Sequence, residues 1–397
     1  MSLTGTSFLT LVALLTVAVF GLLVVFWSRL AGRTVGQIVG RVSLLALVNS
    51  LVLLTASVML NDTYLFYASW GDLHGALTNA VRVTSLNRGA NATVPANSPL
   101  GGGSGAPGVA AAAPADVGTK LPTLPNFQVP GYRVVSYKVR GRASGITNTV
   151  VVELPPGYNS PANRHRRYPV LETFAGYPGS PYQWSSAMQL GAAISRQVAL
   201  GHMRQAVIVE PEQWIPADVD TECVNGVGRT PQLETWLTID VPSWVRHTFR
   251  VSTQRSSWAT AGLSAGGWCA NMATMLHPGQ YGAAIDMGGY FRPVLSPFYQ
   301  PYPRNGRLAA RYNLVARARR QPPPVDIWME TSHLDGVSYH SSAAFLNATR
   351  APLSVHAVMV HDAGHRIGVW KALLPQALQW LGHVLPGFAP TPPQTSG

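Results

Sequence analysis

The sequence contains few cysteines and very few lysines, and each scarcity excludes a class of protein. Only Cys223 and Cys269 occur among the 397 residues, and two thiols cannot build a structural zinc site by themselves. Lysine occurs three times, so 26 of the 29 basic residues are arginine, and the formal net charge is +12. The arginines are scattered without a nucleic-acid-binding signature. We therefore expect no nucleic-acid partner and attribute the charge to composition and to attraction toward an anionic envelope.

Two stretches near the N-terminus lack charged residues altogether. Residues 6–27 and 42–60 are rich in Leu, Val and Ala, and about 20 such residues cross a bilayer. Arg29, Arg33 and Arg41 lie between them without an acidic residue, so the positive-inside rule places this connector in the cytoplasm. Positive charge follows the first stretch rather than preceding it, which does not fit a cleaved signal peptide. The sequence predicts a two-span hairpin in the cell membrane, with one span and one buried helix as the alternative.

The chain divides into four parts by composition. Residues 1–84 are the expected anchor with a juxtamembrane segment, and residues 85–125 are a linker rich in Gly, Ala and Pro that cannot bury enough apolar surface to fold. Residues 126–388 are the expected folded domain, followed by a disordered tail at residues 389–397. Strands alternate with helices in the folded domain, which is typical of an α/β fold with a mostly parallel sheet and helices on both faces.

One motif in this domain indicates chemistry. Residues 262–266 read Gly-Leu-Ser-Ala-Gly, between a short apolar run at 257–261 and an apolar helix pattern at 268–276. Strand, sharp turn and helix is the context in which Gly-x-Ser-x-Gly forms a nucleophile elbow. The two glycines leave room for the turn, and the helix N-terminus directs free N–H groups toward the serine oxygen. Ser264 is the predicted nucleophile.

A nucleophilic serine needs a base, usually histidine, and an acid that orients the base. In α/β-hydrolases the three follow the chain order Ser, acid, His. His365 is the predicted base because it lies between the last predicted strand and the last predicted helix, with His361 as a possible supporting partner. Asp335 is the predicted acid because it follows the strand at 325–331. Glu330, at the carboxyl edge of that strand, is the alternative acid.

The tetrahedral intermediate of ester hydrolysis needs two backbone N–H donors. One is predicted to be the amide of Ala265, directly after the nucleophile. The other is predicted to be the amide of Tyr177, in the loop after the strand at 168–174, where Gly176 permits a close approach of the backbone.

These residues resemble a known family. Residues 130–385 are similar to the Putative esterase, or esterase-D-like, family of α/β-hydrolases, which includes S-formylglutathione hydrolases, feruloyl esterases and the antigen 85 mycolyltransferases. The matching positions are residues 169–171, 175–177, 262–267, 364–365 and Trp370. The whole chain, with its two spans and linker, resembles membrane-anchored actinobacterial esterases of this family. The resemblance implies the same roles for Ser264, His365, Tyr177 and Ala265.

The chain departs from the family pattern at two places. Many relatives have His-Gly where this chain has Ala-Gly at residues 175–176, and residues 332–335 replace the usual Gly-x-x-Asp, which leaves Glu330 open as the acid. The fold implied by the resemblance brings the loop of Cys223 near the helix of Cys269. We therefore predict a disulfide between them, outside the cytoplasm, where disulfides persist.

The sequence as a whole predicts a membrane-anchored, outward-facing serine carboxylesterase that works through an acyl-enzyme intermediate. The expected partner is an acyl-ester substrate, a lipid or a glycan of the cell envelope, and no cofactor or metal is required. One alternative is a cell-envelope acyltransferase resembling mycolyltransferases, in which a sugar hydroxyl replaces water. The other alternative is a non-catalytic envelope binding protein on the same fold, because fold does not imply function.

Overall fold

The computed structural model describes residues 3–4, 6–64, 66–67, 69–78, 82–89, 119–120, 131–217, 219–361 and 363–390. The chain forms two compact units. The first contains Met1–Arg82 together with two short segments, Ser332–Gly336 and His361–Val369, and the second contains the remainder. Most of the predicted linker, at residues 90–118 and 121–125, lies outside the described residues, as do residues 126–130 of the predicted domain and residues 391–397 of the predicted tail.

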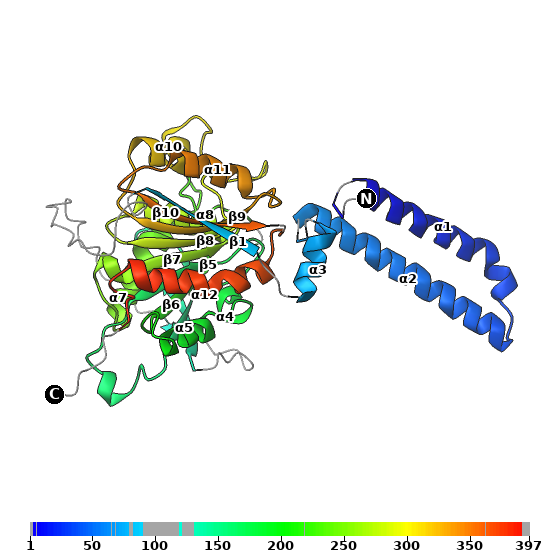
Figure 1. Ribbon diagram of the computed structural model, residues 1–397, viewed down its shortest axis with the longest axis horizontal. Helices are drawn as coiled ribbons and strands as arrows, with labels where there is room; N and C mark the ends of the chain where they lie inside the picture. The colour runs from blue at the N-terminus through cyan, green and yellow to red at the C-terminus, as the bar shows by residue number, and fades with distance from the viewer. Residues whose placement is uncertain are drawn as a thin grey trace. The chain divides into compact units, whose positions relative to one another are not determined.

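The first unit is built on two long apolar helices. Helices α1 (Thr6–Leu30) and α2 (Val35–Tyr64) run side by side, drawn in blue in Figure 1. The mean hydropathy of their most apolar windows is 2.8 and 2.1, and only 17% and 11% of those windows is buried. Both helices are long and apolar enough to cross a membrane. They contain the two predicted spans and extend beyond them.

A short helix that the sequence analysis did not anticipate follows α2. Helix α3 (Trp70–Thr78) begins after Ser69, whose Oγ accepts the backbone N–H of Asp72 at 3.0 Å. This is the bond of an N-cap, which satisfies an amide left without a partner in the first helical turn. The Trp70 ring packs edge-to-face against Phe8 of α1 at 5.3 Å between centroids.

The second unit contains a ten-stranded sheet in the order β1-β10-β9-β8-β7-β5-β6-β4-β3-β2. Its central pairs, β6 with β5, β5 with β7, β7 with β8 and β8 with β9, are parallel, whereas β4 pairs antiparallel with β6 and β3. The strands are β1 (Arg82–Gly89), β2 (Thr119–Lys120), β3 (Arg133–Arg140), β4 (Thr147–Leu154), β5 (Val170–Phe174), β6 (Val207–Pro211), β7 (Trp258–Leu263), β8 (Ala283–Met287), β9 (Asp326–Ser332) and β10 (Ser354–His361). The predicted mostly parallel sheet is thus a mixed sheet with a parallel centre.

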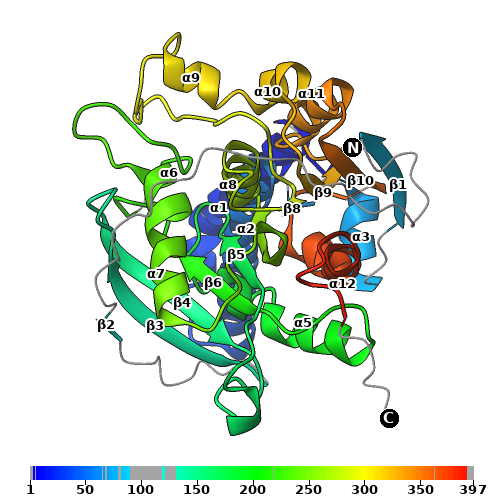
Figure 2. The same ribbon diagram turned by 90° about the vertical axis from the view of Figure 1, so that its left-hand side faces the viewer.

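Helices cover both faces of the sheet. Helices α5 (Leu190–Ala199) and α12 (Ile367–Val384) lie on one face, and α8 (Ala265–Leu276), α10 (Leu314–Arg320) and α11 (Tyr339–Ala348) lie on the other (Figures 1 and 2). The remaining α-helices of this unit are α4 (Gln183–Ser186), α6 (Leu233–Thr235), α7 (Val241–Thr248) and α9 (Arg307–Arg311). Because β5, β6, β7 and β8 lie between these layers, all their residues are buried. Continuous apolar runs of this kind are typical of parallel strands covered on both faces.

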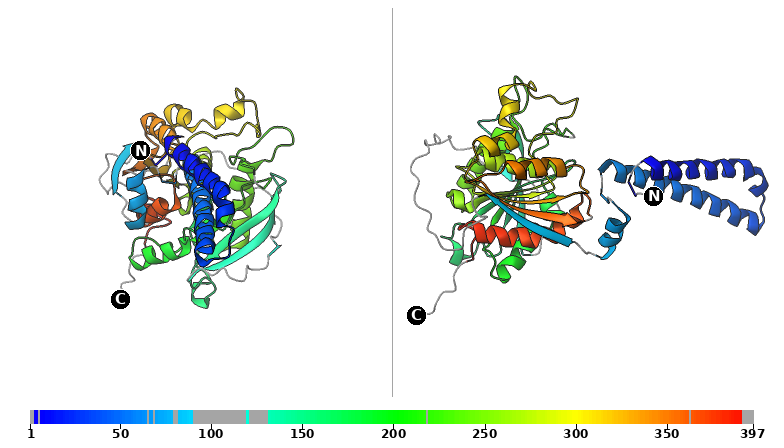
Figure 3. Two further views of the ribbon diagram at one scale, coloured as in Figure 1. Left: turned by 90° about the vertical axis from the view of Figure 1, so that its right-hand side faces the viewer. Right: turned by 45° about the horizontal axis from the view of Figure 1, so that its top comes forward.

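Strand β1 overlaps the start of the predicted linker at residue 85. Strand β1 extends to Gly89 and lies at the sheet edge beside β10, the long cyan arrow on the right of Figure 3. Residues 119–120 also form a strand, because they pair with Lys138 and Tyr137 of β3. The described side chains of β1 are mostly exposed, so the strand does not need a buried apolar face. Its sequence, Arg-Val-Thr-Ser-Leu-Asn-Arg-Gly, accordingly lacks the alternation of apolar residues that marks a half-buried strand.

Candidate active site

Ser264 is the single residue between strand β7 and helix α8. Its φ is 54° and its ψ is −121°, a backbone conformation that residues other than glycine rarely adopt. The turn is held by main-chain hydrogen bonds, since the Ser264 N–H donates to Met287 O at 2.9 Å and its carbonyl accepts from Gly267 at 2.8 Å. This is the sharp strand-to-helix turn that the motif predicts.

The two glycines of the motif are required by close approach of the backbone. A Cβ added at Gly262 would lie 1.8 Å from the carbonyl oxygen of Gly266, and one added at Gly266 would lie 2.2 Å from the carbonyl oxygen of Phe174. Neither contact can relax through a side chain, because the opposing atoms belong to the main chain. The structure thus explains why a small residue stands two positions before and two positions after Ser264.

The loop after β5 passes beside Ser264. A Cβ added at Gly176 would lie 3.2 Å from Leu263 O and 3.5 Å from Ser264 Cβ. The loop is held by amide side chains, because the Gly176 N–H donates to Gln183 Oε1 at 2.7 Å and the Ala175 N–H donates to Gln213 Oε1 at 3.1 Å. Gly176 therefore lies beside Ser264, and the role of the Tyr177 amide as the second oxyanion donor stays a prediction.

Asp335 and His365 are brought together within the first unit. Asp335 follows β9, His365 follows β10, and His365 Nδ1 lies 2.8 Å from Asp335 Oδ2. The two residues are 2% and 9% exposed, so water competes little for the bond. A carboxylate bound at Nδ1 fixes the tautomer in which Nε2 is the basic ring nitrogen. The pairing favours Asp335 over Glu330, which lies inside β9 opposite Met287 of β8.

Ser264, Ala265 and Tyr177 belong to the second unit, whereas Asp335 and His365 belong to the first. The predicted nucleophile and the predicted acid–base pair are therefore carried by different units.

A disulfide joins Cys223 to Cys269 of helix α8, with the two Cα atoms 5.7 Å apart. This is the pair expected from the family resemblance. Cys269 lies five residues after Ser264, and the neighbouring Trp268 donates its indole N–H to Glu222 O at 2.7 Å. The long loop after β6 is thus tied to the first turns of the helix that begins at the predicted nucleophile.

Several carboxyl groups are buried in the second unit away from the predicted site residues. Burial raises the pKa of Glu172 on β5 to about 8, although the hydrogen bond from Tyr281 Oη at 2.7 Å acts in the opposite direction. Burial likewise raises the pKa of Glu153 to about 7, and burial together with the nearby Glu153 raises the pKa of Glu210. Among the described residues, no three His, Cys, Asp or Glu side chains form a group that could hold a metal ion.

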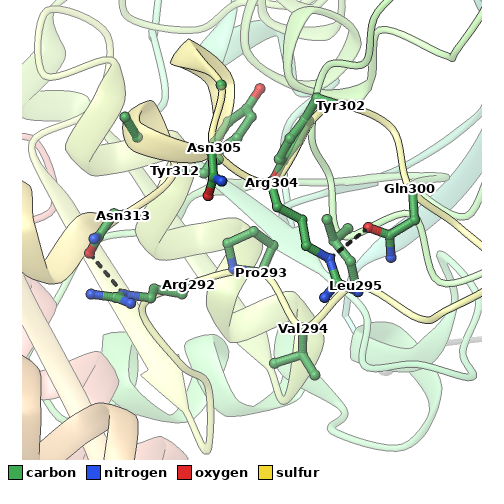
Figure 4. A pocket seen from close by; sticks show the side chains of 13 residues that line it. Arg292, Pro293, Val294, Leu295, Gln300, Tyr302, Arg304, Asn305, Tyr312 and Asn313 are labelled. Carbon is green, nitrogen blue, oxygen red and sulfur yellow. Dashed lines mark hydrogen bonds between the residues drawn. The ribbon is translucent and has the colours of Figure 1, made fainter.

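A pocket of about 670 Å³ lies in the segment after β8 (Figure 4). Its lining includes two guanidinium groups, and each donates to a neighbouring amide oxygen, Arg292 to Asn313 at 2.9 Å and Arg304 to Gln300 at 3.3 Å. The lining contains none of the predicted catalytic or oxyanion residues. We therefore do not assign it to the reaction centre.

Sequence analysis missed the residues that hold the loop of His365. The carboxylate of Asp72 accepts the N–H of Gly364 at 2.7 Å and a guanidinium N–H of Arg366 at 2.6 Å. One local signal was present, because Ser69 and Asp72 are spaced as in a helix capping box. That spacing predicts the start of α3 but not the distant loop that the carboxylate contacts.

The model of the family described as "Putative esterase" matches residues 143–381, which is more than half of the chain. The chain belongs to this esterase family. The family is named for ester hydrolysis, and the family assignment expected from residues 130–385 is confirmed.

The sequence relative that matches this chain has low identity to it and is matched over only part of its length. An uncharacterized protein of Corynebacterium glutamicum is 29% identical over 142 residues, which are 36% of this chain and 32% of that protein. The chain thus spans about a third of the length of the curated relative that it matches.

Many solved structures share the fold. A ferulic acid esterase, 20% identical, has a TM-score of 0.52 and covers 64% of this chain and 98% of its own. An S-formylglutathione hydrolase from Agrobacterium tumefaciens, 14% identical, has a TM-score of 0.54 and covers 67% of this chain and 99% of its own. At these identities the likeness concerns the fold alone, and it confirms the predicted α/β-hydrolase fold.

Proposed function

We propose that this esterase is a serine carboxylesterase anchored in the cell membrane by α1 and α2, and that it hydrolyses acyl esters at the outer face. The observation that carries the serine mechanism is the strained backbone of Ser264, with φ 54° and ψ −121°, at a turn that only glycines can flank. Backbone strain of this kind clusters at active sites, where it is part of the mechanism. The family membership supplies the ester-hydrolysing activity.

In the proposed mechanism the Ser264 hydroxyl attacks the ester carbonyl while His365 Nε2 takes its proton. Asp335 holds the imidazole through Nδ1 and stabilises the imidazolium that forms. The N–H groups of Tyr177 and Ala265 bind the oxyanion, which carries the charge of the tetrahedral intermediate. Collapse of the intermediate expels the alcohol, which receives the proton from His365. Water then attacks the acyl-enzyme with His365 again as base, and the acid is released.

The position in the membrane rests on charge and exposure. Arg29, Arg33 and Arg41 surround the turn between α1 and α2, which favours the cytoplasmic side for that turn. The two helices expose most of their apolar side chains, as spans that face lipid do. The disulfide supports an extracytoplasmic location for the second unit, because disulfides persist outside the reducing cytosol.

Ester hydrolysis by the full-length chain in detergent micelles tests the mechanism. We expect turnover of a short-chain p-nitrophenyl ester, and we expect kcat to fall by about 10⁴-fold or more in Ser264→Ala and in His365→Ala. His383→Ala, at an exposed position in the last turn of α12, serves as the matched control and should keep wild-type activity. Turnover by Ser264→Ala at the wild-type rate would refute the assignment. Analysis of the products with trehalose added separates hydrolysis from acyl transfer.

A membrane-impermeant maleimide tests the orientation in intact cells. Single cysteines replace Arg33, between α1 and α2, and Arg142, at an exposed position after β3. The native cysteines are joined in a disulfide and do not react. We expect labelling at residue 142 and protection at residue 33, and the reverse pattern would place the second unit in the cytoplasm.

A further inference from the structure

The loop that carries His365 is held by a carboxylate from the juxtamembrane helix α3. Asp72 Oδ2 accepts the N–H of Gly364 at 2.7 Å, and Asp72 Oδ1 accepts a guanidinium N–H of Arg366 at 2.6 Å. These two donors lie directly before and directly after His365 in the chain. Asp72 thus bridges the loop on both sides of the histidine, across 292 and 294 residues of sequence.

The carboxylate is itself held firmly. Asp72 lies in the first turn of α3, and its own N–H donates to Ser69 Oγ at 3.0 Å. The residue is 3% exposed, and its side chain is 1% exposed in the ion pair with Arg366. Hydrogen bonds that involve a charged group and exclude water are stronger than neutral bonds at a surface. Both oxygens of the carboxylate are therefore used to fix the loop, and solvent does not replace them.

A second set of contacts links the same loop to the end of α2. The guanidinium of Arg366 lies 5.3 Å from the centroid of the Tyr67 ring, within cation–π range. Tyr67 is fixed by Asn61 in the last turn of α2, because the Tyr67 N–H donates to Asn61 Oδ1 at 2.8 Å and Asn61 Nδ2 donates to Tyr67 O at 3.0 Å. Arg366, the residue after the histidine, therefore contacts both Tyr67, which follows α2, and Asp72 of α3.

We propose that Asp72 is a positioning residue for His365, so that the segment following the membrane anchor completes the site of ester hydrolysis. The inference rests on the proposed role of His365 as the base. Asp335 fixes the imidazole tautomer through Nδ1, and Asp72 fixes the backbone from which the imidazole projects. A general base works only within hydrogen-bond reach of the proton that it removes. Removal of Asp72 leaves the Gly364 amide and the Arg366 guanidinium without this acceptor, and the loop loses its position.

The test compares full-length variants in detergent micelles or liposomes. Asp72→Ala removes both hydrogen bonds, whereas Asp72→Asn keeps an oxygen that can accept from Gly364 and loses the charge that pairs with Arg366. Asp62→Asn, near the C-terminal end of α2, is the matched control for loss of one juxtamembrane charge. We expect kcat to fall by about 10- to 100-fold in Asp72→Ala, as a misplaced catalytic group does, with KM changed less than about threefold.

Asp72→Asn should fall between Asp72→Ala and the wild type, and Asp62→Asn should match the wild type. The kcat–KM split separates positioning from stability, because a residue with only a structural role lowers the melting temperature and leaves kcat per folded molecule unchanged. A double-mutant cycle adds Arg366→Met. If both residues act through one clamp, the double variant loses no more than about twofold beyond the worse single variant, because effects of coupled residues do not add.

The outcomes distinguish this inference from the proposed function. If the wild type hydrolyses the ester and folded Asp72→Ala keeps kcat within about twofold of it, the positioning role is overturned and the serine mechanism stands. If Asp72→Ala does not fold, Asp72→Asn decides, because wild-type kcat in that variant overturns the inference. A wild type that is folded but has no turnover overturns the proposed function and this inference together.

Discussion

The turn that carries Ser264 and the loop that carries His365 are held in different ways. The turn itself spans only residues 262–267, and its close contacts are backbone atoms, both near in sequence, as Gly262 against Gly266, and on neighbouring strands, as Gly266 against Phe174. The loop is held by side chains from far along the chain, namely Asp335, 30 residues away, and Asp72, 292 residues from Gly364. A reactive group that is placed locally leaves a motif in the sequence, whereas one that is placed by distant partners does not.

The largest expected effect is a loss of kcat caused by substitution of Asp335, which pairs with His365. Asp335→Asn leaves the shape of the acid unchanged but favours the wrong imidazole tautomer, so we expect kcat to fall by about 10⁴-fold. Glu330→Gln is the control for the alternative acid, because Glu330 lies within β9 and the pairing with His365 belongs to Asp335. Per folded molecule, its kcat should stay near that of the wild type. The opposite ranking of these two variants in ester hydrolysis would transfer the acid role to Glu330.

Substitutions in the turn around Ser264 should lower the stability of the fold rather than act directly on the reaction. Gly262→Ala forces a Cβ to within 1.8 Å of Gly266 O, and such overpacking costs about 3 kcal/mol of stability or more. Gly279→Ala is the control, because a Cβ there would meet nothing within 4 Å. Urea unfolding of the two variants measures the difference. Equal stability of Gly262→Ala and the wild type would show that the turn is looser than described.

The strand, turn and helix around Ser264 could be predicted from the sequence. The elbow, the helix after it and the neighbouring strands were expected because glycine spacing and apolar runs are local signals, and residues 282–287 correspond to β8 at Ala283–Met287. On the histidine side, chain order led to Asp335 and His365, but no pattern indicated α3 or its contact with Gly364. Strand β1 was missed for a similar reason, since its place beside β10 depends on a pairing across the chain.

Removal of the disulfide should affect the turn around Ser264 and leave the loop of His365 unchanged, because the bond joins Cys223 to helix α8, which begins directly after Ser264. It closes a loop with a sequence separation of 46 residues, and we expect the Cys223→Ala, Cys269→Ala double variant to lose about 2–4 kcal/mol of stability. At a temperature where the variant is folded, kcat should change little, because the disulfide touches neither Asp335 nor His365. Thermal unfolding together with ester turnover checks both parts. Unchanged stability would mean that the bond does not brace the turn.

A last expected effect concerns the pH dependence of stability at Glu172, on the strand beside β7. Its pKa is raised by burial to about 8, from an ordinary value of 4.5. Between pH 4.5 and about 8, Glu172 is therefore protonated in the folded state and ionised in the unfolded state. The contribution of this group is fully present below pH 4.5 and is lost as pH rises to about 8, with a slope of at most about 1.4 kcal/mol per pH unit.

Urea unfolding at several pH values checks the role of Glu172. Glu172→Gln keeps an oxygen that can accept from Tyr281 and does not titrate, so the stability of this variant should fall less steeply between pH 5 and pH 8 than that of the wild type. Identical pH dependence in both proteins would show that Glu172 is ionised in the folded state. Because the effect lies on the nucleophile side of the molecule, kcat of Asp72→Ala relative to the wild type should not change in the Glu172→Gln background.

The most direct test of the serine mechanism is covalent labelling of the full-length protein by a fluorophosphonate, followed by mass-spectrometric mapping of the labelled peptide. A fluorophosphonate reacts with a serine that a base has activated, because the hydroxyl alone is a weak nucleophile. We predict one adduct, on Ser264, that is absent from Ser264→Ala and forms far more slowly in His365→Ala. A folded protein that hydrolyses esters without labelling, or that carries the label on another serine, would contradict the account.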